Sequence, residues 1–401
     1  MKKTKLSRRQ LLQSSLQLSA ALGTMVATTD VAKALSFAPG FRQRGNYWMP
    51  NNISTTSAPA ARVAACFCWT GSKFFIWGGM VSWVASNTGA LYDPFSDTWS
   101  ATSTGTDCPT ARYNAVCLWT GTEVIVWGGT VDGSSYLTTG SKYNPNTNTW
   151  TAMAGTAPSA RAYNTFYWNG TYVVVWGGED IGGIPLGDGK RYDPSGNTWL
   201  PIAAGGPTAR TGLIGISFTA TDTIMWGGFD GAACVNTGAR YNPNSNTWSS
   251  MTSSGGTLGG RANSVVVSTG SKILIWGGQN SAGAMQVDGA QYDPVGDSWT
   301  GITTTGAPSA RFLLPPGAIW TGTRMLIWGG ATDYSFSSPT NTGYSYDPLA
   351  NSWTAFTTTG ALTARSDHAY AWTGSHLVIW GGSSHALGST YTDGKMYKPI
   401  L

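Results

Sequence analysis

The hydrophobic positions of this chain fall in short blocks, and one kind of block recurs seven times. In each copy a short run of mainly β-branched, aliphatic and aromatic residues ends in Trp-Gly-Gly, as in Val124–Gly129. Runs of this length and composition predict buried β-strands. Successive copies lie 49 to 52 residues apart, and a fixed period of this size predicts one supersecondary unit per repeat. The copies are Trp77-Gly78-Gly79, Trp127-Gly128-Gly129, Trp176-Gly177-Gly178, Trp226-Gly227-Gly228, Trp276-Gly277-Gly278, Trp328-Gly329-Gly330 and Trp380-Gly381-Gly382.

Other residues keep the same register in every repeat. An Arg precedes each Trp by 15 to 17 residues, and a Tyr with a Gly three positions before it follows each doublet. The arginines are Arg62, Arg112, Arg161, Arg210, Arg261, Arg311 and Arg365, and the tyrosines are Tyr92, Tyr143, Tyr192, Tyr241, Tyr292, Tyr346 and Tyr397. Because repetition follows architecture, we interpret the arginines and the glycine pairs as structural, with the arginines bonding loop carbonyls between blades.

Each repeat contains four predicted strands. The first follows the Arg, the second ends at Trp-Gly-Gly, the third ends in Tyr-Asn-Pro or Tyr-Asp-Pro in most repeats, and the fourth starts near a later Trp. Asn-Pro or Asp-Pro followed by polar residues is typical of turns. No helical periodicity occurs after about residue 30. The sequence therefore predicts an all-β fold, a seven-bladed propeller with four-stranded antiparallel blades.

The spaced Gly-Gly, Tyr and Trp pattern from about residue 45 to the C-terminus resembles the kelch repeat of bacterial exported propellers and of the galactose oxidase central domain. The resemblance implies the propeller fold and a ligand face formed by the loops after Gly-Gly. It does not imply an activity, because one fold carries many functions.

The seventh repeat ends before its fourth strand, and a spare copy of that strand stands at the other end of the propeller region. Trp48 lies 14 residues before Arg62, close to the internal spacing of 11 to 13. We predict that the strand around Trp48 completes blade seven, which removes open sheet edges.

The first residues read as a targeting segment. A basic start with Ser7-Arg8-Arg9 and a short apolar stretch, ending at Ala32-Lys33-Ala34, predict a signal peptide over 1–34 that resembles the twin-arginine type. We expect a linker at 35–44, one propeller over 45–401, and a location in the periplasm or outside the cell. No later segment predicts a membrane span.

Charge and cysteine content narrow the function classes. Residues 1–34 hold six of the Lys and Arg and one Asp, so the rest of the chain has 18 basic and 18 acidic residues. This balance argues against nucleic acid as a partner. The five cysteines, Cys66, Cys68, Cys108, Cys117 and Cys234, show neither a disulfide framework nor a zinc spacing, although one pair could oxidise outside the cytoplasm. We predict no metal, no cofactor and a monomer.

Residues that break the repeat register are the better candidates for binding. Of the 20 tryptophans only Trp83 has no repeat position, and it serves either as a lid over a neighbouring loop or as a ligand platform. The loops after Trp-Gly-Gly and the segments that enter each first strand should share one face, where binding residues tend to lie. The binding candidates on this face are Trp83, Tyr113, Asn114, Tyr136, Tyr163, Asn164, Asp180, Asn263 and Tyr334.

Candidates for catalysis are few. Asp367, His368 and His385 belong to blade seven and could converge, and an Asp that orients a His makes a general base. Glu179 or Asp230 could meet an arginine at the channel mouth, as the resemblance to sialic-acid mutarotases of the kelch type would require. The two His, two Tyr and one Cys of a copper-radical oxidase cannot be assembled here.

The sequence thus favours an exported binding module for a carbohydrate or a protein segment. The alternatives are an enzyme acting on small sugars and a structural surface protein without a ligand pocket. A deep pocket with convergent charges would indicate the enzyme, and a broad, shallow aromatic patch would indicate the protein binder.

Overall fold

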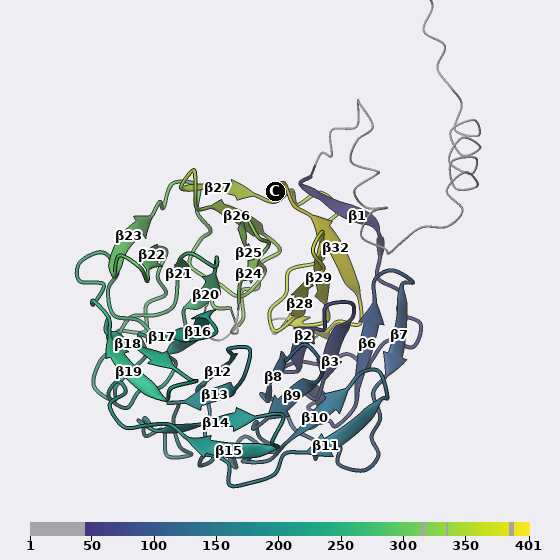
Figure 1. Ribbon diagram of the computed structural model, residues 1–401. Coiled ribbons are helices and arrows are strands. Elements are labelled where there is room, and N and C mark those ends of the chain that lie inside the picture. Colours follow the sequence, from purple (N-terminus) through teal and green to yellow (C-terminus); the bar gives the residue numbers. More distant parts are fainter. Residues whose placement is uncertain (1–44, 314–316, 334–335, 385–388) are drawn as a thin grey trace, which may run out of the picture. The chain divides into compact units, whose positions relative to one another are not determined.

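The computed structural model describes residues 45–313, 317–333, 336–384 and 389–401. The predicted signal peptide and linker lie outside these ranges. The contacts of the chain separate 1–44 from a unit that spans Gly45–Leu401, and the second unit is a ring of seven four-stranded antiparallel sheets (Figure 1). The predicted fold class, a seven-bladed propeller with four strands per blade, is therefore confirmed.

The strands follow the chain blade by blade. Blade one has β2 (Cys66–Trp69), β3 (Phe74–Trp77), β6 (Gly89–Asp93) and β7 (Thr98–Ala101); blade two has β8 (Val116–Trp119), β9 (Val124–Trp127), β10 (Gly140–Asn144) and β11 (Thr149–Ala152); blade three has β12 (Thr165–Trp168), β13 (Val173–Trp176), β14 (Gly189–Asp193) and β15 (Thr198–Pro201); blade four has β16 (Ile214–Thr219), β17 (Asp222–Trp226), β18 (Gly238–Asn242) and β19 (Thr247–Ser250).

The remaining blades repeat this order. Blade five has β20 (Val265–Ser268), β21 (Ile273–Trp276), β22 (Gly289–Asp293) and β23 (Ser298–Ile302); blade six has β24 (Ile319–Trp320), β25 (Met325–Trp328), β26 (Gly343–Asp347) and β27 (Ser352–Ala355); blade seven has β28 (Ala369–Trp372), β29 (Leu377–Trp380), β32 (Gly394–Lys398) and β1 (Tyr47–Asn52). Two short hairpins, β4 (Met80–Val81) with β5 (Val84–Ala85) and β30 (Ser383–Ser384) with β31 (Ser389–Thr390), extend from blades one and seven.

The N-terminal strand closes the ring. β1 pairs antiparallel with β32, with Trp48 opposite Tyr397, so blade seven joins both ends of the propeller (Figure 1). The pairing is irregular between Trp48 and Asn52, where Pro50 has no amide hydrogen to donate. The predicted closure is therefore confirmed.

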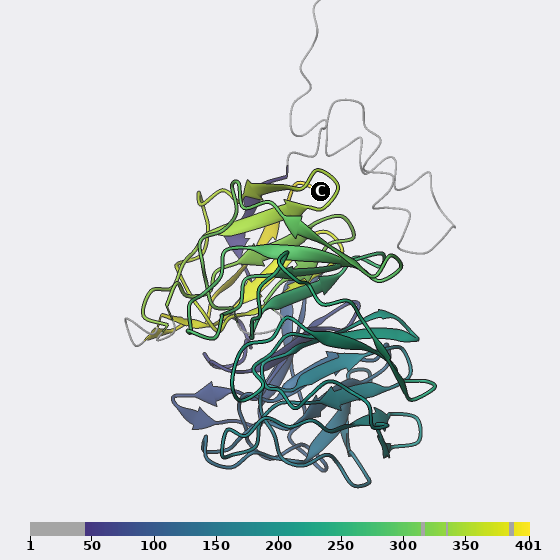
Figure 2. The same ribbon diagram turned by 90° about the vertical axis from the view of Figure 1, so that its left-hand side faces the viewer.

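The first strand of every blade lies at the centre of the ring (Figure 1) and contacts the first strands of both neighbouring blades. Figure 2 shows the same blades from the side. The second strand lies between two strands and between two neighbouring blades. All four residues that precede Gly-Gly are therefore buried in all seven blades. This explains why they are apolar without alternation, except for Thr223 in blade four, whose hydroxyl donates to the carbonyl of Tyr241.

The glycine pairs are required by both backbone conformation and space. The first glycine has φ between 66° and 73° and the second between 83° and 93°. A Cβ on the second glycine would lie only 2.4–2.8 Å from a carbonyl oxygen of the segment that enters the blade. Such an approach is shorter than real Cβ contacts, so only glycine allows the loop to cross this segment.

One polar contact joins the blades around the outer rim, and the sequence interpretation missed it. In every blade an Asn or Asp before the fourth strand accepts a hydrogen bond of 2.5–2.8 Å from the repeat Tyr. The same oxygen accepts a backbone amide of the preceding blade at 2.7–2.9 Å. These residues, here called the rim Asx residues, are Asn46, Asp97, Asn148, Asn197, Asn246, Asp297 and Asn351.

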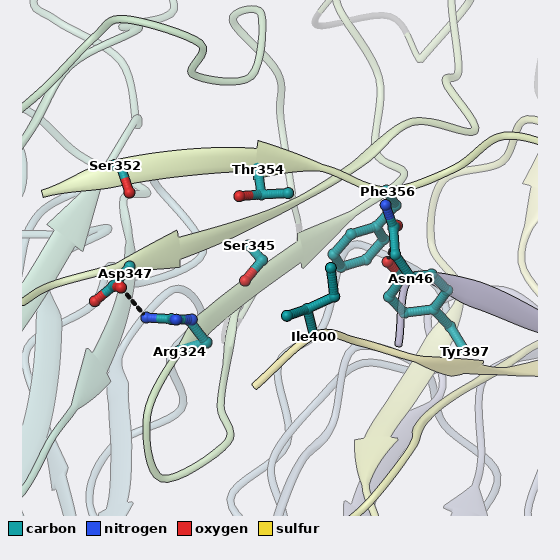
Figure 3. A pocket seen from close by; sticks show the side chains of 9 residues that line it. All are labelled: Asn46, Arg324, Ser345, Asp347, Ser352, Thr354, Phe356, Tyr397 and Ile400. Carbon is teal, nitrogen blue, oxygen red and sulfur yellow. Dashed lines mark hydrogen bonds and ion pairs between the residues drawn. The ribbon is translucent and has the colours of Figure 1, made fainter. Parts of the chain in front are cut away.

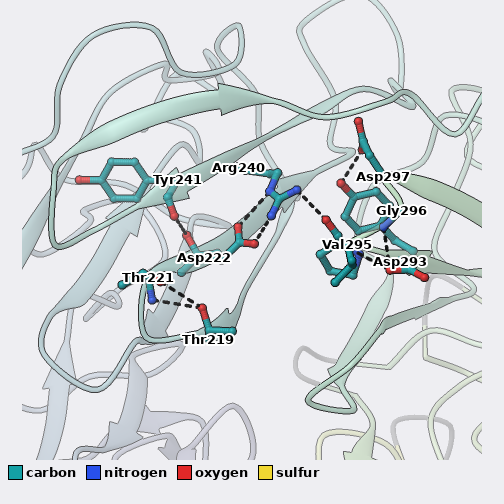
Figure 4. A network of polar contacts seen from close by, with 12 residues as sticks. Thr219, Thr221, Asp222, Arg240, Tyr241, Asp293, Val295, Gly296 and Asp297 are labelled. Carbon is teal, nitrogen blue, oxygen red and sulfur yellow. Dashed lines mark hydrogen bonds and ion pairs between the residues drawn. The ribbon is translucent and has the colours of Figure 1, made fainter.

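A second contact between blades lies on the face opposite the post-Gly-Gly loops. In Figure 4 the guanidinium of Arg240 in blade four holds the carboxylate of Asp222 and donates a 2.7 Å hydrogen bond to the carbonyl of Pro294 in blade five. Lys142 and Arg191 donate to the carbonyls of Pro194 and Pro243 in the same way. A cation on the third strand thus holds the turn of the next blade.

Candidate functional site

The loops after Trp-Gly-Gly and the segments that enter the first strands form one face of the ring. In each blade the entry segment forms a β-bridge with the residue after Gly-Gly, for example Tyr113 with Thr130 and Ala162 with Glu179. Backbone hydrogen bonds also join loops to the next blade, since Gly79 donates to the carbonyl of Arg112. This surface, here called the loop face, has the arrangement that the strand order predicts.

Residues with left-handed backbone surround the mouth of the channel on the loop face. Six of the seven entry segments place one such residue two positions before the first strand: Ala64, Asn114, Tyr163, Gly212, Asn263 and Asp367. The amides of Asn114, Gly212 and Asn263 each donate to the carbonyl of the corresponding residue in the preceding blade. Asn and Gly tolerate this conformation, but a bulky aromatic such as Tyr163 rarely adopts it.

Beneath this mouth lies a cavity of about 510 Å³ along the central channel. Its wall comes from the first strands and is largely apolar, with Phe67, Trp119 and Phe166 among the rings. Tyr163, Asn164 and Asn263 contribute polar groups near the mouth. The volume is in the range of small-ligand pockets, and the lining that the described residues provide contains no Asp, Glu, Lys, Arg or His side chain. The described part of this wall thus brings no charged side chains together.

Five sequence candidates come together where blades two and three meet on the loop face. Tyr113 and Tyr136 both form backbone β-bridges with Thr130. The Tyr113 hydroxyl lies against Gly133, where a Cβ would be only 2.7 Å from it. Glu179 bridges to the residue before Tyr163, and Asp180 follows it. Burial, and then the negative charge of Glu179, raise the pKa of both Tyr136 and Tyr163. We call Tyr113, Tyr136, Tyr163, Glu179 and Asp180 the tyrosine–glutamate site.

The other binding candidates are more dispersed. Trp83 occupies the two-residue turn of the β4–β5 hairpin with Ser82, and both residues have positive φ (65° and 50°). Such turns favour Asn-Gly, so Ser-Trp is an unusual choice, and the Trp83 side chain remains 58% exposed. Asn114 is exposed, Asn164 donates to the carbonyl of Thr165, and Tyr334 lies outside the described residues.

Two carboxylates among the candidates have local structural partners. One oxygen of Asp180 accepts the amides of Gly182 and Ile184, and one oxygen of Asp230 accepts those of Ala232 and Ala233. These are Asx turns, which order the loop tip. Asn280 makes the contacts of Asp180 in blade five, with the amides two and four residues on, so this turn requires an oxygen acceptor and not a charge.

The seven repeat arginines have the same partners in every blade. Each donates from Nη1 to the carbonyl of the first glycine of its own Gly-Gly pair at 2.9–3.2 Å. Nη1 also donates to a carbonyl just before the third strand, at 2.6–3.4 Å. The acceptor is the residue that precedes the glycine three positions before the repeat Tyr. The expectation that these side chains join neighbouring blades is wrong, because both acceptors belong to the blade of the arginine.

This position also keeps the arginines away from the channel. All seven are buried, and Arg161 pairs with Asp188 of its own blade. Within the described residues no arginine forms an ion pair with Glu179 or Asp230, as the mutarotase alternative would need. Backbone amides, and to a smaller extent the charge of Arg210, lower the pKa of Asp230, so these two side chains interact only at longer range.

The blade-seven candidates do not form an accessible general base. His368 is only 6% exposed, and its ring packs edge-on against the ring of Trp328, with 4.9 Å between the ring centroids. Within the described residues its Nδ1 has no hydrogen-bond partner. Burial, with a smaller contribution from Arg365, lowers the pKa of His368 to about 3. Asp367 lies at the channel mouth, and His385 lies outside the described residues.

We predict that His368→Leu makes the protein more resistant to acid. Because the folded pKa lies below the ordinary value of 6.5, the unfolded chain binds an extra proton between these values. The contribution of the neutral ring is thus complete above pH 6.5 and is lost, by up to about 1.4 kcal/mol per pH unit, as the pH falls toward 3. Leu213 occupies the same register in blade four and is buried, so leucine fits this position in a blade.

The measurement is the unfolding midpoint in guanidinium chloride between pH 7 and pH 3.5. The slope of stability against pH should be shallower in His368→Leu than in the wild type. Burial lowers the pKa of His376 on the opposite face as well, but this residue is less buried than His368, so its replacement should reduce the slope less and serves as the comparison. Parallel slopes for His368→Leu and the wild type would show that His368 does not cause the acid sensitivity.

All five cysteines are free thiols. Cys66 and Cys68 on β2 and Cys117 on β8 belong to one apolar cluster between blades one and two. Burial and the neighbouring thiols raise the pKa of Cys117, which favours the protonated, unreactive form. In the described part of the chain no group of three His, Cys, Asp or Glu side chains is arranged to hold a metal ion.

A smaller pocket of about 70 Å³ lies on the opposite face between blades six and seven (Figure 3). Asn46, Ser345, Tyr397 and an ion pair between Arg324 and Asp347 line it. This volume is enough for a few water molecules, so the pocket is not a substrate site. Nowhere in the described ranges does a helix reach the length and hydrophobicity that a membrane crossing needs.

Comparison with known proteins agrees with the geometry. The family described as the KLHDC2/KLHL20/DRC7 Kelch-repeats domain matches residues 42–214 and 153–315, which together span about two thirds of the chain. No curated protein matches this sequence. With the repeat pattern, the seven four-stranded blades and this match, the chain belongs to the kelch-repeat β-propeller family.

Proposed function

We propose that this propeller is an interaction module that binds a segment of another protein on the loop face of blades one to three. The observation that carries the proposal is the exposure of large apolar side chains on three consecutive post-Gly-Gly loops and the entry segment beside them. Each is between 45% and 68% exposed: Trp83, Val84, Val131, Tyr163, Ile181 and Ile184. Clusters of this kind mark interaction surfaces, and kelch propellers are generally protein-interaction modules.

Two features favour a protein segment over a sugar. The exposed side chains include Ile181, Ile184 and Val84, which bury well against another protein but offer no flat ring for a sugar to stack on. On the opposite face, Phe95, Val295 and Leu349 are also exposed, but each lies singly in the turn before the fourth strand of its own blade. The apolar loops of blades one to three therefore form the stronger candidate surface.

We predict that the double variant Trp83→Ser, Ile184→Ser loses partner binding and keeps the fold. Aromatic anchors at interfaces contribute about 2 kcal/mol or more, so affinity should fall by roughly thirty-fold or more. The measurement is affinity capture with the tagged full chain from cells of its source, followed by quantitative mass spectrometry. Phe95→Ser, which removes an exposed aromatic ring from the opposite face, is the control. Partners retained by the double variant but lost with Phe95→Ser would contradict the proposed face.

We also propose that the chain is exported and that cleavage occurs before Leu35, as the pattern of residues 1–34 predicts. We expect the double variant Arg8→Lys, Arg9→Lys to keep the protein inside the cell, because the arginine pair is the feature that a twin-arginine pathway reads. Cell fractionation and N-terminal sequencing provide the measurement. An unaffected location, or a mature protein that starts at Met1, would refute this proposal.

A further inference from the structure

The residues of the tyrosine–glutamate site depart from the repeat. At the register of Glu179 the other six blades have uncharged residues: Met80, Thr130, Phe229, Gln279, Ala331 and Ser383. Tyr163 is the left-handed residue of its entry segment. The corresponding left-handed residues of the other blades are small or have short polar side chains. The propeller fold therefore does not require a carboxylate or an aromatic ring at these positions. Both occur together on the loop face where blades two and three meet, which is called the joint below.

The carboxylate of Glu179 has no hydrogen bond or ion pair from a side chain or backbone group of the described chain, although the residue is half-buried. The other carboxylates of blades three and four on this face have partners: Asp180 and Asp230 accept amides, and Asp188 pairs with Arg161. The repeat arginines of blades two, three and four are buried and donate to their own blades: Arg112, Arg161 and Arg210. The other cations of blades two and three donate to backbone carbonyls elsewhere: Lys142, Lys190 and Arg191. In the described chain none of these cations pairs with Glu179.

The aromatic rings around Glu179 complete a site for a cation. Tyr136 and Tyr163 both lie within the electrostatic reach of Glu179, and Tyr163 is 61% exposed. A cation over a tyrosine ring gains about 0.5–2 kcal/mol, and a carboxylate beside it adds a charge-assisted hydrogen bond. Val131, Ile181 and Ile184 are exposed on the two loops that carry this site.

We propose that the tyrosine–glutamate site binds a Lys or Arg side chain of the partner segment, while Ile181 and Ile184 contact an apolar residue next to it. The inference rests on the proposed function, since it assumes that the partner is a protein segment on the loop face. It adds the chemistry of recognition: a basic residue beside an apolar one, held between blades two and three.

The test begins with a random twelve-residue peptide library displayed on phage and selected on the immobilised full chain. We expect enriched peptides to contain Lys or Arg adjacent to Leu, Ile, Val or an aromatic residue. The strongest peptide is then synthesised with a fluorescent label, and its dissociation constant is measured by fluorescence anisotropy against each variant.

Glu179→Gln should weaken this peptide at least tenfold, and Asp230→Asn should change its affinity less than twofold. The second variant removes the same charge from the loop face one blade away, and Asn280 shows that an Asn at this register also forms an Asx turn. Replacing the basic residue of the peptide with Gln should cause a similar loss, and Glu179→Gln should then add little further. This non-additivity identifies Glu179 as the partner of the cation.

The outcomes separate the two proposals. Enriched peptides that lack basic residues, or that bind Glu179→Gln as well as wild type, overturn the inference. If such peptides still lose binding to the Trp83→Ser, Ile184→Ser variant, the loop face is supported as the binding surface and only the role of Glu179 is refuted. A selection that yields only peptides insensitive to every loop-face variant, or no peptides at all, contradicts both.

Discussion

Trp48→Ala is expected to lower the free energy of unfolding by about 3–5 kcal/mol, the usual cost of removing a buried large aromatic side chain. Trp48 is buried and packs against Trp328 at 5.6 Å and Tyr397 at 5.1 Å between ring centroids. Its Nε1 donates a 2.9 Å hydrogen bond to the carbonyl of Thr357. β1 joins blade seven through noncovalent contacts across the ring closure, so losing them should also release this strand.

The release of β1 distinguishes ring closure from simple packing. Trp150→Ala removes an equally buried tryptophan from blade two, where a short turn connects β10 and β11. Both variants should lose stability, as measured by unfolding in guanidinium chloride. Only Trp48→Ala should make the backbone amides of β32 exchange hydrogen rapidly, because β32 then becomes an open edge. Equal protection of β32 in the two variants would contradict the closure.

Arg112→Met is expected to cost about 3 kcal/mol although Arg112 forms no ion pair with a described residue. Arg112 donates to the carbonyls of Gly128 at 3.0 Å and Thr139 at 2.8 Å, and burial lowers the pKa of its guanidinium to about 10, so it stays charged at neutral pH. Methionine fills much of the volume but leaves the carbonyl of Gly128 without a donor, at about 1–3 kcal/mol, and removes one of the two donors to the carbonyl of Thr139, which keeps the amide of Gly128.

The matched variants for this prediction are Arg112→Lys and Lys190→Met. Lysine keeps the charge but lacks the planar fork that reaches several acceptors, so it should recover only part of the stability. Lys190 donates to one exposed carbonyl, so its replacement should cost less than about 1 kcal/mol. Unfolding midpoints in guanidinium chloride provide the comparison, and an Arg112→Met protein as stable as wild type would refute the structural role of the repeat arginines.

The sequence predicted those features of the fold that repeat with a visible residue type. Trp-Gly-Gly, Arg and Tyr mark the second strand, the entry segment and the third strand, and the misplaced Trp48 predicted the closure. The rim Asx residues escaped notice because Asn and Asp alternate at that position and also occur in ordinary turns. A search for Asn or Asp five residues after each repeat Tyr would have found six of them.

The partners of individual side chains were harder to predict. The arginines bond within their own blades because the first Gly of each pair turns its carbonyl toward the entry segment, a backbone geometry that residue spacing does not reveal. Asp180 was a candidate for binding and Asp230 for catalysis, but each accepts backbone amides that order its own loop. Conversely, Tyr113, Tyr136, Tyr163 and Glu179 were assigned to one face from strand direction, yet their meeting at one joint depends on the three-dimensional path of two loops.

Hydrogen–deuterium exchange of the full chain, free and saturated with the strongest selected peptide, tests the central claim most directly. The account predicts slower exchange in the post-Gly-Gly loops of blades one to three, at 80–86, 131–137 and 179–186, and no change in the turns of the opposite face. Protection confined to the opposite-face turns at 93–98, 293–298 and 347–352 would contradict it.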